Sequence, residues 1–242
     1  MIYVTGDIHG GCTMNNIVEW EEGKNLTHDD YLVIAGDFGI PWEFSITEDD
    51  LIYWIESRPW TTLFVDGNHE RFSWWKDQPI EEWHGGRVQR LSKYSRIRRL
   101  MRGEVFDFDG TTLFTMGGAT SVDREWRIEG YSWWPEELPS EKEIKYARGM
   151  LDSVYWEVDY VVTHTCASDL LSKTLYPYSG WQSPDTDRLT NFFNELESKL
   201  DFRRWYYGHF HIDRNIDHRH TALMDAIVPL GEGIPLGYSM ER

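Results

Sequence analysis

Short apolar runs alternate with polar, helix-like segments over the first third of the chain. Three of these runs end in a turn of glycine with Asp or Asn, and they read MIYVTGD, DYLVIAGD and TTLFVDGN. Each run predicts a β-strand, and residues 13–22 and 46–57 between them have the spacing of helices. Units of about 30 residues are typical of βαβ folds, whose parallel strands end at one edge of a sheet. We therefore expect the three turns to face one crevice.

The middle of the chain follows a different pattern. Asp109 and Gly110 separate two alternating runs, which predicts a hairpin within an antiparallel meander over residues 97–118. Residues 118–139 are irregular, aromatic and charged. A long segment of this kind is expected to be an ordered loop that shapes an active site.

The last third returns to helices and strands. Ser140 and Glu143 form a capping-box pair, which predicts a helix over residues 141–156. A second helix is expected over residues 183–200, which begin with a Ser-Pro pair suited to a helix start. Three further runs predict one strand each, and they read DYVVTH, RRWYYGHFH and TALMDAIVPLG.

The chain is expected to form one α/β domain over residues 1–242, with residues 118–139 as an aromatic-rich loop insertion. No linker rich in Pro, Gly or Ser divides its 242 residues, and the length is compatible with a single large domain. Aromatic residues make up 15% of the chain, and 40% of it is hydrophobic, which together favour a packed core over disorder.

Charge and cysteine content exclude several classes of protein. The net charge of -17 opposes general affinity for nucleic acid or anionic membranes, unless bound cations or a local basic patch reverse it. Cys12 and Cys166 lie far apart without a CxxC pair, so neither a disulfide framework nor a thiolate zinc site is indicated. No run approaches the ~20 apolar residues of a membrane span. We expect a soluble cytoplasmic protein with free thiols and no membrane partner.

Polar residues with metal-binding chemistry follow five of the predicted strands. They are Asp7 and His9, Asp37, Asn68 and His69, His164, and His209 and His211. Each group alone is more typical of a turn or a structural histidine, but five groups need only one assumption, that the strand ends converge. Imidazole nitrogens with carboxylate and amide oxygens suit Mn²⁺ first, and also Fe²⁺ or Zn²⁺, rather than Ca²⁺.

The number of candidate ligands predicts two ions. Seven of these residues exceed the needs of one ion, and two ions ~3.5–4 Å apart would share them if one carboxylate bridges. His69 then remains as a general acid for a leaving alkoxide.

The ordered motifs resemble those of the calcineurin-like metallophosphoesterases. They read GDIHG, GDFG, GNHE, TH and GHFH, and they span Gly6 to His211. The resemblance implies a four-layer αββα sandwich with two mixed β-sheets and a dinuclear centre at the strand ends. It implies a first metal held by Asp7, His9 and His211, and a second held by Asn68, His164 and His209. It also implies that Asp37 bridges the ions and that His69 is the catalytic acid.

The second motif departs from some branches of that family. The protein Ser/Thr phosphatases and diadenosine tetraphosphatases have a motif close to GDxxDRG, whereas this chain has GDFGIPW. Ile40 stands where an Asp would orient the catalytic histidine, and Pro41 stands where an Arg would contact phosphate. A bacterial or phage type is expected instead, in which Glu43 is a candidate for the orienting carboxylate. The candidate substrate contacts are Asn68, Arg71, Arg124 and Arg127.

The leading hypothesis is a hydrolase in which metal-bound hydroxide attacks a phosphomonoester or phosphodiester, with a nucleotide among the candidate substrates. The alternative is a nuclease or cyclic-nucleotide phosphodiesterase. The basic residues 87–102 and three tryptophans, Trp126, Trp133 and Trp134, support that alternative unless they serve ion pairing and packing. A third hypothesis is a non-catalytic binding protein stabilised by metal. An uncommitted His69 speaks against it, because a scaffold needs no free acid.

Overall fold

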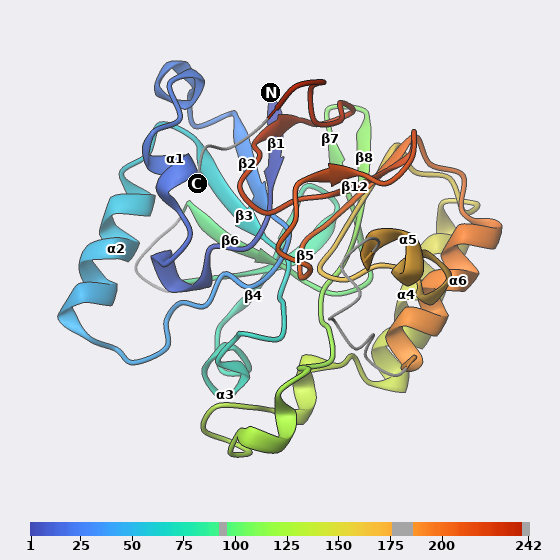
Figure 1. Cartoon of the computed structure of the whole chain (residues 1–242), viewed down its shortest axis with the longest axis horizontal. Coiled ribbons are helices and arrows are strands. Elements are labelled where there is room, and N and C mark those ends of the chain that lie inside the picture. The colour runs from blue at the N-terminus through green and yellow to red at the C-terminus, as the bar shows by residue number, and fades with distance from the viewer. Residues whose placement is uncertain (92–95, 176–185, 239–242) are drawn as a thin grey trace.

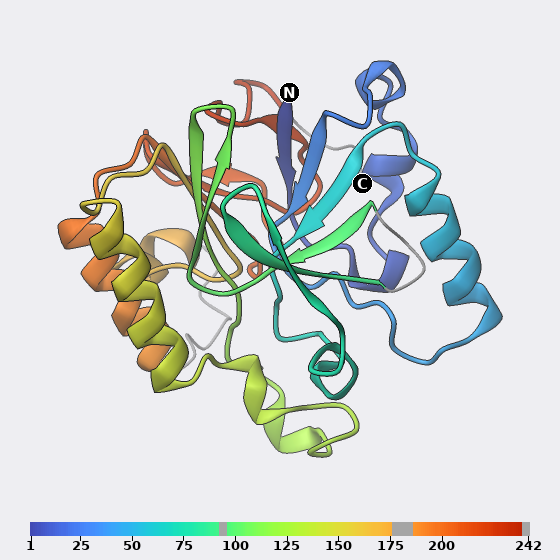
Figure 2. The same cartoon turned by 180° about the vertical axis from the view of Figure 1, so that it is seen from behind.

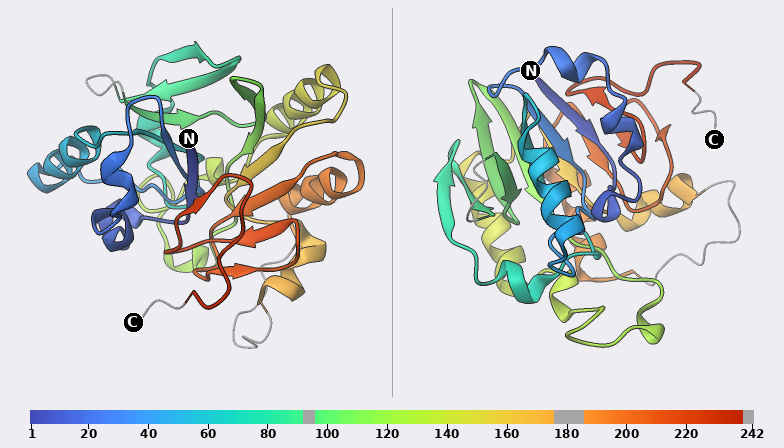
Figure 3. Two further views of the ribbon diagram at one scale, coloured as in Figure 1. Left: turned by 90° about the horizontal axis from the view of Figure 1, so that it is seen from above. Right: turned by 90° about the vertical axis from the view of Figure 1, so that its left-hand side faces the viewer.

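Two mixed β-sheets pack face to face and carry helices on their outer sides (Figure 1). The computed structural model describes residues 1–91, 96–175 and 186–238. The view from behind and the view from above show the same four layers, with helices on opposite sides of the two sheets (Figures 2 and 3). The predicted αββα sandwich is confirmed.

The first sheet has seven strands in the order β13-β1-β2-β3-β6-β5-β4. Their bounds are β1 (Ile2–Thr5), β2 (Tyr31–Ile34), β3 (Thr61–Phe64), β4 (Ile80–Trp83), β5 (Gly86–Arg90), β6 (Ile97–Leu100) and β13 (Val228–Pro229). The central strands β1, β2, β3 and β6 are parallel, and the edges are antiparallel. The first three strands therefore end at one edge, as their spacing predicts.

The second sheet has six strands in the order β11-β12-β10-β9-β8-β7. Their bounds are β7 (Glu104–Phe108), β8 (Thr111–Met116), β9 (Tyr160–Thr163), β10 (Arg204–Tyr207), β11 (Arg214–Asn215) and β12 (His220–Ala222). Strands β8, β9, β10 and β12 are parallel. This sheet repeats the plan of the first, with a parallel centre and antiparallel edges.

Six α-helices lie among the described residues, and the longer ones form the outer layers. Their bounds are α1 (Asn15–Val18), α2 (Ile46–Glu56), α3 (Phe72–Trp75), α4 (Glu141–Ser153), α5 (Leu171–Leu175) and α6 (Arg188–Lys199). Helix α2 covers the first sheet, whereas α4 and α6 cover the second (Figures 1 and 2). No helix in the described ranges has the length and apolar content needed to cross a membrane.

The strand residues alternate between two apolar layers. Val33 of β2 packs between the sheets, whereas its neighbours Leu32 and Ile34 pack under the helices of the outer layer. Side chains alternate along a strand, so a strand covered on both faces must be apolar throughout. This is why the sequence shows continuous apolar runs rather than an alternation of apolar and polar residues.

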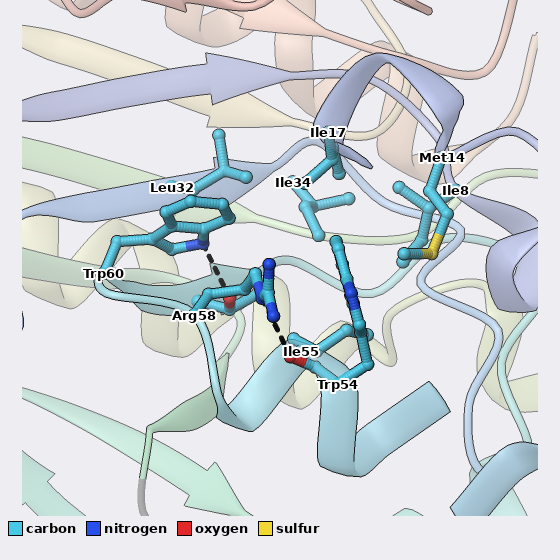
Figure 4. Close-up of a pocket in the computed structure, with 10 residues that line it drawn as sticks. Ile8, Met14, Ile17, Leu32, Ile34, Trp54, Ile55, Arg58 and Trp60 are labelled. Atoms are coloured by element: carbon cyan, nitrogen blue, oxygen red, sulfur yellow. Dashed lines mark hydrogen bonds between the residues drawn. The ribbon is translucent and has the colours of Figure 1, made fainter. Parts of the chain in front are cut away.

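Helix α2 packs closely on the first sheet and leaves only a small cavity of about 10 Å³ (Figure 4). Ile8, Trp54 and Trp60 are among its lining residues, and Trp60 donates a hydrogen bond to Thr62 Oγ1. A cavity of this size holds at most one water. It is a packing defect rather than a ligand site, and it lies directly behind the loop that carries the first motif.

Helix boundaries follow the predicted capping residues where the structure describes them. The capping box of Ser140 and Glu143 is present at the start of α4. That helix ends at Ser153, three residues before its expected end, and Trp156 has a left-handed φ of 58°. Helix α6 starts after its N-cap Asp187, and the Ser-Pro start expected for it lies outside the described residues.

The helix predicted over residues 13–22 is wrong, because α1 has only four residues. Thr13 donates to the main-chain oxygen of Asp7, and Asn16 donates to that of Asp225. These side chains bind neighbouring strand ends, which favours a compact turn over a long helix.

The single strand predicted at TALMDAIVPLG is also wrong, because the segment divides into β12 and β13 in different sheets. The Asp213 carboxylate accepts hydrogen bonds from the main-chain N–H groups of Met224, Asp225 and Ala226. Those three N–H groups are therefore not available for hydrogen bonds to a neighbouring strand. The chain bends there and passes from one sheet to the other.

The meander predicted over residues 97–118 is correct only for its hairpin. Strands β7 and β8 pair antiparallel, with Asp109 and Gly110 at their turn. Strand β6 instead runs parallel to β3 in the other sheet. It also pairs with the β4–β5 hairpin, which the sequence analysis did not anticipate.

A buried ion cluster joins the end of β3 to β6. Asp66 is fully buried and accepts from Arg99 Nη2 at 2.9 Å and from Arg102 Nε at 2.7 Å. Burial opposes ionisation of Asp66, but the two guanidinium groups hold its pKa below the usual range. The cluster fixes the residue that immediately precedes the third motif, GNHE.

We predict that Arg102→Met lowers the free energy of unfolding by about 3 kcal/mol, because it leaves a buried carboxylate with one partner. Urea denaturation measures the change. The matched control is Arg203→Met, since Arg203 is 73% exposed in its ion pair with Asp159, and its loss is expected to cost less than about 1 kcal/mol. Equal effects of the two substitutions would contradict a structural role for the Asp66 cluster.

Candidate metal centre

The carboxyl ends of five parallel strands meet where the two sheets join. Asp7, Asp37 and Asn68 follow β1, β2 and β3 of the first sheet, while His164 and His209 follow β9 and β10 of the second. His9, His69 and His211 lie two or fewer positions beyond these residues in the chain. The structure brings all eight side chains into one continuous cluster. Their expected roles as ligands and acid stay predictions.

One group of ligand atoms comes from Asp7, His9 and His211. The Nε2 atoms of His9 and His211 lie 3.0 Å apart, and they lie 3.8 and 3.4 Å from Asp7 Oδ2, respectively. Atoms bound to a common ion at about 2.1 Å lie about 3.0–3.4 Å from one another at tetrahedral or octahedral angles. The separations therefore fit one divalent ion with little rearrangement.

A second group forms around His164. Its Nε2 atom lies 3.1 Å from Asn68 Oδ1 and 3.3 Å from Asp37 Oδ1. The His209 ring packs edge-on against the His164 ring, with centroids 5.0 Å apart. The two separations from His164 Nε2 match the same ligand spacing, so His164, Asn68 and Asp37 fit a second ion, with the His209 ring beside them.

Asp37 lies between the two groups. Its Oδ1 atom faces His164, whereas its Oδ2 atom lies 3.8 Å from His9 Nδ1. Burial alone would raise the pKa of this carboxyl, but the imidazoles of His164, His69 and His9 hold it far below its usual range. An ionised carboxylate with its oxygens toward different groups has the chemistry of a bridging ligand.

His164 is oriented by a hydrogen bond on its far side. Its Nδ1 atom lies 2.8 Å from the Ala35 carbonyl oxygen, which accepts an N–H and leaves Nε2 directed at Asp37 and Asn68. Burial alone would lower the pKa of His164, but Asp37 and Asp7 raise it to about 10. The carboxylates thus stabilise positive charge at this position, and a divalent ion would supply that charge in place of a proton on His164.

His209 is held in the neutral form that metal ligands require. Burial, together with repulsion from His164, lowers its pKa to about 3. Its main-chain N–H donates to both carboxylate oxygens of Asp7 at 3.1 Å. This bond joins the fifth motif to the first. The two motifs follow strands of different sheets, so the main chain itself ties the sheets together at the site.

Four candidate ligands have a left-handed backbone. The φ angles of His9, Asp37, His209 and His211 are 44°, 47°, 69° and 52°. Such conformations are costly for residues with a side chain and collect at functional sites. The strain indicates that the backbone conformation directs these side chains toward the site. No sequence pattern predicts a left-handed φ at these residues.

Two motif glycines make room for the side chains of neighbouring motifs. A Cβ atom on Gly36, whose φ is 99°, would lie 2.0 Å from His164 Nδ1. A Cβ atom on Gly67 would lie 2.0 Å from Asp37 Oδ1. Each glycine is therefore required by the close approach of a candidate ligand.

His69 lies at the rim of the cluster beside a loop arginine. Its main-chain N–H donates to Asp37 Oδ1 at 2.7 Å, and its Nδ1 and Nε2 atoms lie 3.4 and 3.1 Å from the two terminal nitrogens of Arg127. The ring nitrogens point apart, so one guanidinium reaches both only by lying across the ring face. Burial lowers the pKa of His69, and the charge of Arg127 lowers it further. The charge of Asp37 acts in the opposite direction.

The other candidate substrate arginines occupy different positions. Arg71 donates to the main-chain oxygen of Trp42 and lies over the Phe44 ring. Arg124 lies over the Trp133 ring at 3.7 Å. Arg71 therefore supports the segment after the second motif, whereas Arg124 and Arg127 both belong to the loop over residues 118–139. That loop projects from the same end of the molecule as α3 (Figure 1).

The tryptophans of the loop divide into two kinds. Trp133 and Trp134 are buried, whereas Trp126 is 82% exposed. Trp134 packs edge-on against Trp42 at 5.4 Å. Packing is thus the role of two of the three tryptophans named as candidates for base stacking.

The basic residues of the segment 87–102 are engaged in the fold. Within the described part of the chain, five form ion pairs with acidic residues: Arg87, Arg90, Arg96, Arg99 and Arg102. Arg98 lies over the Trp83 ring, and Lys93 lies outside the described residues. This arrangement favours a structural role over attraction of nucleic acid.

The cysteines differ in their surroundings. Cys166 is buried, and burial raises the pKa of its thiol to about 12. Cys12 is exposed and lines a cleft with His9 and His69. Neither cysteine belongs to a candidate ligand group among the described residues.

Sequence reasoning missed two residues that support the centre. The buried Glu70 carboxylate accepts from the N–H groups of Phe38 and Gly39, so it joins the third motif to the second. Burial, and then the charges of Asp37 and Asp66, raise its pKa to about 8. Its position directly after His69 in GNHE was the available signal.

Ser121 is the second missed residue. Asn68 Nδ2 donates to Ser121 Oγ at 3.3 Å, and Ser121 Oγ in turn donates to Glu137 at 2.6 Å. This contact turns the Asn68 amide so that Oδ1 faces His164. The loop over residues 118–139 therefore orients a candidate ligand as well as approaching His69.

Imidazole and carboxylate groups that could hold a metal ion cluster at the joined edges of two mixed sheets in this α/β protein. A family model described as calcineurin-like phosphoesterase matches residues 1–213, and the chain belongs to this family. The resemblance seen in the five motifs is thereby confirmed at family level, while the bacterial or phage type stays a prediction. No curated protein sequence matches the chain at a significant level. The family implies a hydrolase of phosphoesters that binds divalent metal ions.

We predict that Gly67→Ala weakens Mn²⁺ binding by about 10- to 100-fold, because the added methyl group displaces the Asp37 carboxylate. Calorimetric titration of chelator-treated protein measures the dissociation constant, and circular dichroism establishes that the variant is folded. The control is Gly149→Ala in α4, where a Cβ meets nothing within 4 Å. Unchanged Mn²⁺ affinity in a folded Gly67→Ala protein would remove Asp37 from the binding site.

Proposed function

We propose that this protein hydrolyses phosphate esters with two divalent ions, preferentially Mn²⁺, held by seven strand-end residues. They are Asp7, His9, Asp37, Asn68, His164, His209 and His211. The observation that carries the proposal is the position of Asp37, whose Oδ1 atom lies 3.3 Å from His164 Nε2 in the second group and whose Oδ2 atom lies 3.8 Å from the His9 ring of the first group. We further propose one domain over residues 1–242, with residues 118–139 as its loop insertion. The free cysteines favour a cytoplasmic location.

The residues present suit a reaction without a covalent enzyme intermediate. Two divalent ions held by these residues would supply the positive charge that polarises the phosphoryl oxygens and acidifies a water nucleophile. Asp7 and Asp37 supply the negative charge that retains both ions, and the neutral ring of His209 supplies a lone pair. The chain itself then needs to bind the phosphate, orient it and protonate the departing oxygen.

His69 is the proposed proton donor to that oxygen. It is partly exposed at the rim, and its main-chain N–H is anchored on Asp37. This anchor holds a ring nitrogen of His69 within 4.8 Å of ligand atoms of His9 and Asp37, so the proposed acid lies close to the reacting phosphate. The residue that faces the ring is Arg127 rather than Glu43, so the proposed orienting role passes from a carboxylate to a guanidinium.

Arg127 is also the best-placed of the candidate phosphate donors. Asp123 accepts from its Nε at 2.6 Å, and the Ser132 carbonyl accepts from Nη1, which fixes the guanidinium beside His69. A fixed fork of N–H donors suits the oxygens of a phosphoryl group. Asn68 and Arg124 remain secondary candidates, and Arg71 is occupied by the neighbouring segment.

The alternative of a nuclease or cyclic-nucleotide phosphodiesterase keeps less support. Ion pairs occupy most of the basic segment 87–102, and Trp126 is the one exposed tryptophan of the three candidates. Salt-sensitive cleavage of labelled DNA or RNA would favour it. Activity confined to small esters would favour the leading proposal.

We predict that wild-type protein hydrolyses alkyl and nitrophenyl phosphates only with a divalent ion, and that chelation abolishes turnover. Asp37→Asn is expected to lower kcat/KM at least about 100-fold on both ester types, because it weakens both ion sites. Turnover of either ester by metal-free wild type would overturn the proposal. Turnover by Asp37→Asn at the wild-type rate would also overturn it.

A separate outcome identifies the acid. His69→Ala is expected to slow alkyl phosphates by about 10²- to 10⁴-fold but nitrophenyl phosphate far less, because nitrophenolate departs without a proton. The matched control is His218→Ala, since His218 is exposed and lies outside the candidate ligand groups. Equal loss on both esters would assign His69 to binding rather than to proton transfer.

A further inference from the structure

A cleft of about 600 Å³ opens beside the candidate centre. His9 and His69 line it together with residues of the segment 42–48, among them Trp42 and Glu43. His69 is the proposed proton donor to the departing oxygen. The part of the substrate attached to that oxygen would therefore lie in this cleft.

The wall of the cleft is held in place by its own contacts. The Glu48 carboxylate accepts from the N–H groups of Trp42, at 2.6 Å, and of Phe44. Ser45 caps α2, and Arg71 donates to the Trp42 carbonyl oxygen. The Trp42 ring packs edge-on against Trp134. A cleft with walls fixed in this way is preformed for binding.

The charge of the cleft is negative. Among the described residues that line it there is no lysine or arginine, and its carboxylates belong to Glu43 and Glu48. Glu48 is occupied by main-chain donors, whereas Glu43 is exposed and makes no hydrogen bond or ion pair with the described part of the chain. The cation beside His69 is Arg127, which belongs to the loop 118–139 and is outside the lining.

This acidic wall coincides with the departure in the second motif. Pro41 stands where related branches have a phosphate-binding arginine, and Trp42 and Glu43 follow it directly. The chain thus has an aromatic ring and a carboxylate directly after the position at which those branches carry an arginine. A second phosphate in this position would meet Glu43, and no lysine or arginine is among the described residues that line the cleft.

We propose that this cleft binds the leaving group, and that the substrates are phosphate esters of uncharged or cationic, ring-bearing alcohols. The inference rests on the proposed function. The Trp42 ring offers a surface for packing an aromatic or saturated ring, and Glu43 accepts hydrogen bonds from hydroxyl or amino groups. Glu43 disfavours substrates that carry another anionic group beyond the ester oxygen.

Three phenyl phosphates test the proposal because they share one leaving oxygen. Their para substituents are 2-aminoethyl, ethyl and carboxymethyl, which carry charges of +1, 0 and -1. With Mn²⁺ at low ionic strength, wild-type kcat/KM is expected to fall in that order, about tenfold or more from first to last. Glu43→Gln compresses the series, and Glu43→Lys reverses it. Added salt weakens both preferences, as expected for an exposed charge.

The control variant is Asp50→Lys, which makes the same charge change on the exposed surface of α2 outside the cleft lining. It is expected to leave the order of the three esters unchanged. An equal effect of Asp50→Lys would assign the preference to the total charge of -17 and overturn the role of Glu43.

The remaining outcomes separate this inference from the function on which it rests. Metal-dependent hydrolysis of all three esters with equal kcat/KM, in wild type and Glu43→Lys alike, overturns the charge preference and leaves the proposed function standing. Absence of metal-dependent hydrolysis with every ester overturns the proposed function, and the inference falls with it.

Discussion

The burial of two neighbouring carboxylates, Asp7 and Asp37, is the constraint on which the rest of the structure depends. Their side chains are essentially inaccessible, and an ionised carboxylate loses a large hydration free energy on burial unless partners replace the water. Main-chain N–H groups of His209 and His69 supply part of that replacement, and imidazoles supply more. Strand ends from both sheets are needed to deliver these partners. The joined edge of the sandwich is therefore built around negative charge that divalent ions complement.

The central layers could be predicted from the sequence because most of the central strands are buried on both faces and therefore have the same apolar pattern. Strands such as β2, covered on both faces, must be apolar throughout, and each ends in a turn where the chain leaves the core. Edge elements lack that signature. Strand β4 alternates exposed and half-buried positions and carries two glutamates, so its pairing with β5 leaves no strong pattern. The division of the last run into β12 and β13 depends on Asp213, a side chain eleven or more residues away from the groups it binds.

The candidate site could be read from the sequence only as far as side-chain chemistry reveals it. Imidazole, carboxylate and amide groups after five strands indicated metal binding, because few other functions need that set. The supporting contacts of Glu70 are made to main-chain N–H groups, which every residue except proline has, so no partner residue marks them. The left-handed backbone at His9 and Asp37 could not be predicted either, because histidine and aspartate rarely adopt a positive φ whereas glycine often does.

The distribution of charge explains how so acidic a chain can act on an anionic ester. Its cluster of basic residues is paired with acidic side chains within the fold, as Arg99 and Arg102 are with Asp66, and contributes little free positive charge. Under the proposed function, attraction for phosphate arises locally, from bound ions and from Arg127 beside His69. Such attraction acts over a few ångströms and is screened beyond about 10 Å at moderate salt. A single phosphoryl group can enter this field, whereas an extended polyanion would also meet the repulsion of a chain with a net charge of -17.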